Sequence, residues 1–281
     1  MKKRSNLELE PVIGLIEDHL EERLGLDRVA ELSHYSKYYL HRAFSGAFGM
    51  TIHDYIRRRQ LTEGARLLTS SEKTILEIAL GCGYESQQAF SAVFKAMYKK
   101  TPAQYRKRGT HYALQLPLKA GCEEKWTFDG SDIRPAERGD VEPWMRLVDL
   151  SAGGYPMLNE EEYRGQLEDS IRKERALILR KGETVLGAML FSDETGCIQF
   201  MGVHPRCWNQ GIPEMFLKKL KAEYIPGREV STTTFRDGDP ADNGQRNIWK
   251  LLGFQEGELL EEYGYPTQRL VLPPGAGEGR L

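Results

Sequence analysis

The stretch "SQQAFSAVFKAMYKKTPAQYR", residues 86–106, repeats an earlier part of the chain at an offset of 50 residues. The earlier copy is "SKYYLHRAFSGAFGMTIHDYI", residues 36–56. Four residue types coincide, so that Ser36, Phe44, Thr51 and Tyr55 correspond to Ser86, Phe94, Thr101 and Tyr105. Repetition at a fixed period indicates that one supersecondary unit is present twice.

Each copy predicts a short helix, a tight turn and a second helix. "LDRVAELSHYS" leads into "SKYYLHRAFSGAFG", and "TILEIALGCGYES" leads into "SQQAFSAVFKAMYKK", with Ser36 and Ser86 as the helix N-caps. Apolar residues at helical spacing predict the buried stripe of each second helix. The stripes are Leu40, Ala43, Phe44 and Ala47, and Phe90, Val93, Phe94 and Met97. The sequence therefore predicts an all-α domain with two helix-turn-helix units.

The opposite face of each second helix carries polar side chains that are predicted to be exposed. They are Lys37, Tyr38, His41 and Arg42 in the first unit and Gln87, Gln88, Ser91 and Lys95 in the second. Glutamine can make two hydrogen bonds to adenine and arginine two to guanine, so Arg42, Gln87 and Gln88 are the predicted base readers. Arg58, between the units, is a predicted phosphate contact. The alternative is that these residues form a solvated surface.

The segment between the two units predicts a helical spacer. "TIHDYIRRRQLTEGARLLTSS" would form a helix of about 20 residues, roughly 30 Å long, and one turn of DNA is about 34 Å. This spacing predicts that one monomer places two recognition helices in successive major grooves of double-stranded DNA. The binding site would then be asymmetric. Residues 24–118 carry 14 Lys or Arg against 7 Asp or Glu, a net charge of +7, whereas the whole chain has −2. The positive surplus favours a nucleic-acid-binding surface.

Residues 8–108 resemble the two-unit DNA-binding domain of the AraC/XylS family of transcription regulators, in "SKYYLHRAF", "IALGCGYESQQAF" and "TPAQYR". The resemblance implies sequence-specific promoter binding and makes RNA polymerase an expected partner. The residues that it implies for base recognition are Tyr38, His41, Arg42, Gln87, Gln88 and Ser91. Ala92 stands where the family often has a base-contacting arginine, which implies that the two glutamines dominate recognition in the second groove.

The second half of the 281-residue chain alternates predicted strands and helices and indicates a mixed α/β domain. We expect the two-unit domain over residues 1–110, a linker over 111–128, the α/β domain over 129–275 and a tail over 276–281. Residues 131–273 resemble the GNAT acetyltransferase superfamily, in "IRPAERGDVEPW", "GVHPRCWNQGIPEMFL" and "NIWKLLGF". The fold class is therefore multi-domain, an all-α double helix-turn-helix domain followed by an α/β GNAT-like mixed-sheet domain.

The GNAT resemblance implies a site for acetyl-CoA or another acyl-CoA. The residues that it places there are Val203, Trp208, Asn209, Gln210, Gly211, Ile212 and Asn243. Several residues depart from the family pattern. Trp208 and Pro213 replace the ends of the loop, and Pro213 lacks an N–H that would bind an anion. Gln199 and Trp249 replace the usual base and acid, and neither side chain can act as one.

These departures favour a second domain that senses a small-molecule effector or an acyl-CoA, with no catalytic residue assigned. One alternative is an active N-acetyltransferase in a bifunctional DNA-binding protein, and another is a domain that serves only for interaction. Cys82, Cys122, Cys197 and Cys207 are scattered and predict reduced thiols, while His204 and Cys207 are too few for a metal site. The chain shows no signal peptide and no membrane span, so a cytoplasmic protein is expected.

Overall fold

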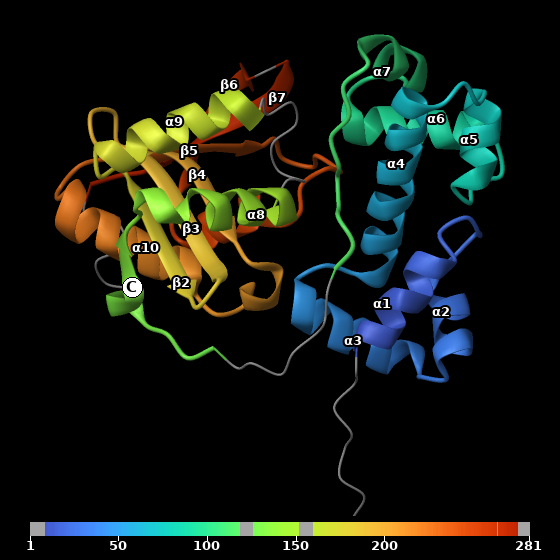
Figure 1. Cartoon of the computed structure of the whole chain (residues 1–281), viewed down its shortest axis with the longest axis horizontal. Helices are drawn as coiled ribbons and strands as arrows, with labels where there is room; N and C mark the ends of the chain where they lie inside the picture. Colours follow the sequence, from blue (N-terminus) through green and yellow to red (C-terminus); the bar gives the residue numbers. More distant parts are fainter. Residues whose placement is uncertain (1–8, 119–125, 152–159, 263, 275–281) are drawn as a thin grey trace, which may run out of the picture. The chain divides into compact units, whose positions relative to one another are not determined.

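The computed structural model describes residues 9–118, 126–151, 160–262 and 264–274. The chain divides into two compact units, Met1–Glu124 and Lys125–Leu281 (Figure 1). Residues 119–125 of the predicted linker and the predicted tail, 276–281, lie outside the described residues. No helix in the described ranges is both long enough and apolar enough to cross a membrane.

The first unit is helical, as the repeat predicts. Its helices are α1 (Leu9–Asp18), α2 (Leu26–Ser33), α3 (Lys37–Phe48), α4 (Ile52–Ser70), α5 (Ile75–Gly81), α6 (Gln87–Tyr98) and α7 (Pro102–Arg108). The pairs α2–α3 and α5–α6 are the two helix-turn-helix units, and α4 runs from one to the other (Figure 1). The predicted double helix-turn-helix architecture is confirmed.

Side-chain caps fix where the repeated helices begin. Ser36 Oγ accepts a hydrogen bond from the Tyr39 N–H, and Ser86 Oγ accepts one from the Ala89 N–H. A cap of this kind satisfies one of the amide donors that a helix N-terminus leaves unpaired. Both predicted serine caps are confirmed, and α3 and α6, the second helices of the two helix-turn-helix units, therefore begin at equivalent repeat positions.

The core of each helix-turn-helix unit contains a phenylalanine at the same repeat position. Phe44 and Phe94 are fully buried. The Phe44 ring contacts Tyr55 with 5.5 Å between ring centroids, and the Phe94 ring meets Tyr105 edge-on at 5.3 Å. Burial of such rings supplies most of the hydrophobic stabilisation available to small helices. The 50-residue repeat in the sequence is thus a repeat of packing contacts.

The second unit contains a seven-stranded mixed sheet. Its strands are β1 (Ile133–Pro135), β2 (Ala176–Lys181), β3 (Thr184–Ser192), β4 (Cys197–Val203), β5 (Val230–Phe235), β6 (Gln255–Glu262) and β7 (Tyr265–Leu272), in the spatial order β1-β2-β3-β4-β5-β7-β6. Neighbouring strands are antiparallel except for β4 and β5. The predicted mixed-sheet domain is confirmed.

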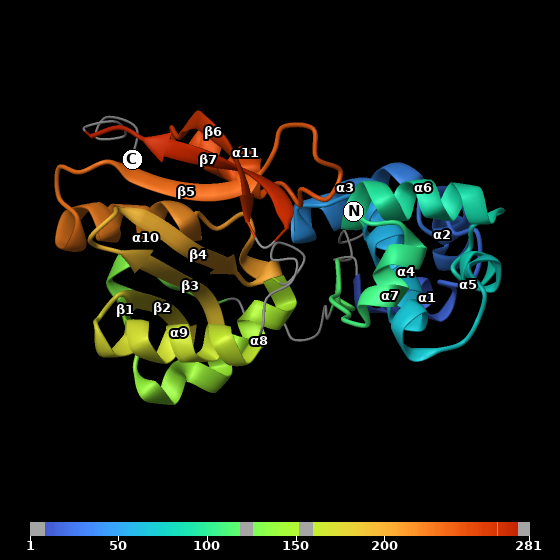
Figure 2. The same cartoon turned by 90° about the horizontal axis from the view of Figure 1, so that it is seen from above.

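Helices cover both faces of this sheet (Figures 1 and 2). They are α8 (Val141–Ser151), α9 (Glu160–Arg172), α10 (Ile212–Lys219), which continues as a π-helical turn over Leu220–Tyr224, and α11 (Gln245–Leu251). Successive residues of a strand point to opposite faces, so Ile178 packs with α8 and α9 while its neighbour Leu179 packs with α10 and α11. The strands are therefore buried on both sides.

The parallel pair β4–β5 is joined over a short length. Only Cys197 with Ser231 and Ile198 with Thr232 pair in register among the described residues. A bulge at Leu190 and Phe191 bends the neighbouring strand β3 against β4. From Gln199 onward the two central strands are no longer paired, so the middle of the sheet offers polar strand groups to a ligand or to water.

Candidate functional site

The exposed face of α3 brings the first group of predicted DNA-binding residues together. Lys37, Tyr38, His41 and Arg42 are all exposed, and Tyr38 retains 75% of its surface. The Arg42 guanidinium lies 5.4 Å from the centre of the Tyr38 ring. This contact holds a planar group with several hydrogen-bond donors beside an aromatic ring on one helical face. The arrangement can offer donors to base edges and apolar surface to a thymine methyl group.

The exposed face of α6 carries the second group. Gln87, Gln88 and Lys95 are exposed and Ser91 is half-buried. The side-chain amides of Gln87 and Gln88 make no hydrogen bond to any other described residue. Both lie in the first turn of the helix, next to the Ser86 cap. Two amide groups at the start of a helix can reach base edges when that end enters a major groove.

Arg58 does not lie where a phosphate contact requires it, and this prediction was wrong. The structure buries Arg58 to 3% exposure on α4. Arg58 follows Tyr55 by three residues and precedes Thr62 by four, so all three fall on one buried stripe of the helix. A buried guanidinium cannot reach the DNA backbone. The helical spacing of these residues in the sequence was the signal that could have shown it.

The exposed basic residues that the sequence interpretation missed lie at the end of α7. Lys107 and Arg108 are exposed in its last turn, whereas the equivalent positions of the first repeat, Arg57 and Arg58, are half-buried and buried. The two basic pairs correspond at the 50-residue offset. However, α4 continues for about three turns beyond the first pair, whereas α7 ends at the second. Exposure therefore differs although the residue types agree.

The predicted acyl-CoA residues lie around the N-terminus of α10. Gly211 adopts a left-handed conformation with φ of 69° before the helix, and Ile212 is fully buried in the core beneath it. The predicted residue Val203 ends β4, while Asn209 and Gln210 are exposed in the preceding turn. The Trp208 ring lies against Gly244, where an added Cβ would come within 3.2 Å of it. The turn thus meets the loop that holds Asn243.

His204 and Cys207, in the same turn, are not arranged as a reactive pair. Burial, with a smaller effect of the Arg206 charge, lowers the pKa of His204 to about 4, so the imidazole is neutral at pH 7. Its Nδ1 accepts a hydrogen bond from the Arg206 N–H. Burial raises the pKa of Cys207 to about 11, so its thiol stays protonated. In the described parts of the chain, no three His, Cys, Asp or Glu side chains are grouped to hold a metal ion.

A pocket of about 620 Å³ opens beside the unpaired part of β4 and β5. Gln199, Thr233, Thr234 and Thr267 of the sheet and residues of α9 line it. The hydroxyl oxygens of Thr234 and Thr267 are buried and have no hydrogen-bond partner among the described residues. Buried polar atoms are normally paired, so these two oxygens are suited to a bound ligand or ordered water.

Charged side chains at the rim of this pocket leave one carboxylate without an ion pair. Lys173 pairs with Asp169 at 2.7 Å, and Arg175 pairs with Glu194 at 3.1 Å. Glu262, also in the lining, forms no ion pair with a described residue. The lining therefore favours a small polar ligand that carries hydrogen-bond donors or a positive charge. No sequence pattern indicates this pocket, because its lining residues extend from Tyr163 to Thr267, which are more than 100 positions apart.

Comparisons with known proteins match the first unit. The helix-turn-helix domain family matches residues 29–108. Regulatory protein SoxS of Escherichia coli strain K12 is 42% identical over 100 residues, which are 36% of this chain and 94% of SoxS. The right origin-binding protein of the same strain is 39% identical over 108 residues, 38% of this chain and 37% of that protein.

For the second unit, a GNAT-family acetyltransferase from Bacillus cereus is similar in structure. It has 14% sequence identity and a TM-score of 0.40, and the match covers 50% of this chain and 96% of that chain.

Proposed function

Because the chain belongs to the AraC-type helix-turn-helix family of regulatory proteins, we propose that it binds an asymmetric DNA site as a monomer, with α3 and α6 in successive major grooves. DNA binding itself follows from the family. The arrangement on DNA and the residues that read the bases are the proposal. RNA polymerase is the partner that we propose for a regulator of this kind.

The observation that carries this proposal is the pair of exposed polar faces at the two ends of α4. The helix has 19 residues, so it is about 28 Å long at 1.5 Å per residue, close to the roughly 34 Å of one DNA turn. The faces of α3 and α6 stand at equivalent repeat positions behind equivalent serine caps. One monomer can therefore present two recognition helices to one side of a duplex.

Substitutions distinguish the residues that read bases from those that contact only the DNA backbone. We expect Arg42→Ala, Gln87→Ala and Gln88→Ala each to weaken specific binding by about 1 to 3 kcal/mol and to relax the preference at individual base pairs. Each of these side chains would form a pair of hydrogen bonds with its base that another base cannot complete. Selection of binding sites from random duplexes, followed by titration of the selected site, measures both effects.

The control for this experiment is Lys107→Ala on the exposed end of α7. It should weaken binding to all DNA sequences by a similar factor, because a phosphate contact carries no sequence information. It should also reduce the salt dependence of binding. If the Gln87→Ala, Gln88→Ala double variant selects the same sequences as the wild type, α6 does not read bases through these residues.

For the second unit we propose a GNAT-like domain that senses a small polar ligand in the 620 Å³ pocket. The order of its strands and helices, which follows the motifs in the sequence, supports the GNAT-like fold. Ligand binding is supported by the buried hydroxyls of Thr234 and Thr267 and by the Glu262 carboxylate, which has no ion pair within the described part of the chain. An acyl-CoA at the Gly211 turn and a purely interacting domain are the rival proposals.

Thermal melting with a panel of small hydroxylated amines tests the sensing proposal. We expect at least one compound to raise the melting temperature and to change the affinity of the full chain for its DNA site. Glu262→Gln should weaken the binding of that compound by roughly tenfold or more, since a hydrogen bond to a charged group contributes about 1.5 to 3 kcal/mol. Glu261→Gln, at an exposed position of the same strand and outside the pocket lining, is the matched control.

The same preparation distinguishes the rival proposals. We expect weak or no acetyl-CoA binding by calorimetry and no acetylated product, because Gln199 and Trp249 supply neither base nor acid and each such step contributes roughly 10² to 10⁴ in rate. Tight acetyl-CoA binding that Gly211→Trp abolishes, together with an acetylated amine, would establish an acetyltransferase. A full panel without any melting shift would favour an interaction domain.

A further inference from the structure

The residues that follow the second helix-turn-helix unit run back along α4. Residues 112–118, which we call the strap, belong to no helix or strand and are partly or fully buried except Pro117. At the start of the strap, the Tyr112 N–H donates to the Tyr105 hydroxyl at 3.0 Å, and the Tyr112 carbonyl accepts from the Tyr98 hydroxyl at 3.2 Å. The Tyr112 ring lies 5.0 Å from that of Tyr98. The strap is thereby attached to α6 and α7.

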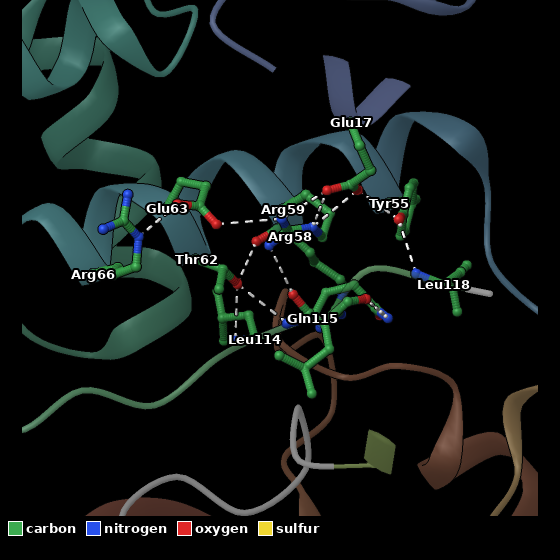
Figure 3. A network of polar contacts seen from close by, with 11 residues as sticks. Glu17, Tyr55, Arg58, Arg59, Thr62, Glu63, Arg66, Leu114, Gln115 and Leu118 are labelled. Atoms are coloured by element: carbon green, nitrogen blue, oxygen red, sulfur yellow. Dashed lines mark hydrogen bonds and ion pairs between the residues drawn. The ribbon is translucent and has the colours of Figure 1, made fainter. Parts of the chain in front are cut away.

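The middle of the strap is attached to α4 through one hydroxyl. The N–H groups of Leu114 and Gln115 donate to Thr62 Oγ1 at 3.0 and 3.2 Å (Figure 3). Arg59 Nη1 donates to the Gln115 carbonyl at 3.2 Å. Thr62 retains 4% of its surface, so these bonds are shielded from water while the strap is docked. Its hydroxyl also donates to the Arg58 carbonyl at 2.8 Å.

The end of the strap is attached to the first helix-turn-helix unit. The Leu118 N–H donates to the Tyr55 hydroxyl at 3.1 Å, and that hydroxyl donates to Glu17 of α1 at 2.6 Å (Figure 3). The Leu118 side chain is buried in the same core as Phe44 and Ile16. The strap therefore contacts α6 and α7, the spacer helix α4 and the core of the first helix-turn-helix unit.

A second connection between the two helix-turn-helix units lies on another side of α4. Gln60 donates to the carbonyls of Leu20 and Glu22 at 3.0 and 3.1 Å, and Gly83 packs against the Glu22 carbonyl. Gln60 and Thr62 are two residues apart, so their side chains diverge by about 200° around the helix. Connections on nearly opposite sides of α4 resist both bending and rotation of one unit against the other.

We propose that Thr62 and Tyr55 are positioning residues for DNA recognition: by docking the strap, they hold α3 and α6 in the one relative orientation that lets both enter DNA together. The inference rests on the proposed two-groove mode of binding. Two linked binding modules gain affinity from each other only when both can engage at once. Loss of the strap contacts should therefore reduce binding to a complete site much more than binding to either half of it.

Full-length variants test this division. Thr62→Val removes the acceptor of two strap amides, and Tyr55→Phe removes the hydroxyl between Leu118 and Glu17. The complete site is the sequence that the wild type selects from random duplexes. Each variant should bind this site about tenfold or more weakly than the wild type does. Each should leave a duplex with one half scrambled within about twofold of the wild type. Amide hydrogen exchange should show faster exchange at Leu114 and Gln115 in Thr62→Val.

Two matched variants should behave as the wild type. Thr62→Ser keeps the hydroxyl, and Gln115→Ala removes a side chain whose contact is to the neighbouring Leu116 carbonyl, while the strap bonds use the backbone of Gln115. Equal loss on complete and half sites would overturn the proposal, as would wild-type affinity of Thr62→Val with its strap amides exchanging faster. If the wild type binds complete and half sites equally, the two-groove mode itself fails.

Discussion

Gly83→Ala should destabilise the first unit by about 2 to 4 kcal/mol and lower the fraction of protein that can bind DNA at physiological temperature. Gly83 has a φ of +77°, which costs other residues about 1 kcal/mol or more, and an added Cβ would lie 2.2 Å from the Glu22 carbonyl oxygen. That oxygen belongs to the backbone and already accepts from Gln60. Overpacking against a fixed group typically costs a further 1 to 3 kcal/mol.

Gly81→Ala is the matched control, two residues earlier in the same turn region. An added Cβ there meets nothing within 4 Å, and Gly81 is the last residue of α5. Alanine is preferred to glycine in helices by up to about 1 kcal/mol, so this variant should be as stable as the wild type or slightly more stable. Urea denaturation followed by circular dichroism measures both. Equal stability of the two variants would show that the α5–α6 turn can move away from Glu22.

The local features of the first unit could be predicted because the residues that determine them occur in both copies of the repeat. Ser36 and Ser86 cap the recognition helices, and Phe44 and Phe94 fill equivalent cores, as the 50-residue offset indicated. Arg58 was misplaced because charge was taken as a sign of exposure, whereas its helical spacing from Tyr55 placed it inside. Periodicity was the stronger signal in this helix.

The strap and the pocket could not be predicted, because both depend on contacts between distant residues. The strap has no helical or strand periodicity, and its bonds join backbone amides to Thr62, which lies more than 50 positions earlier. The pocket depends on where β4 and β5 stop pairing. The residue types at positions such as Gln199 and Thr234 do not by themselves indicate a pocket, and no residue type in the strap indicates its contacts.

Arg59→Met should destabilise the first unit by about 3 to 5 kcal/mol, because it breaks an ion pair that is largely buried. Arg59 retains 5% of its side-chain surface and Glu17 21%, and three bonds of 2.7 to 3.0 Å join them (Figure 3). Burial by itself lowers the pKa of Arg59, but the hydrogen bonds and charge of Glu17 outweigh it and the pKa is raised. Without the guanidinium, the Glu17 carboxylate stays desolvated beside Tyr55.

The same substitution two residues earlier shows how much of this effect comes from burial. Arg57 pairs with Asp54 at 2.7 Å, but both are about one-third exposed, so Arg57→Met should cost less than about 1 kcal/mol. Adding Glu17→Gln to Arg59→Met should recover much of the lost stability, since the double variant leaves no buried charge uncompensated. Purely additive effects in this double-mutant cycle, measured by urea denaturation, would mean that the pair does not hold α1 on α4. The strong coupling expected would identify Arg59 as the residue that joins α1, the spacer helix α4 and the strap.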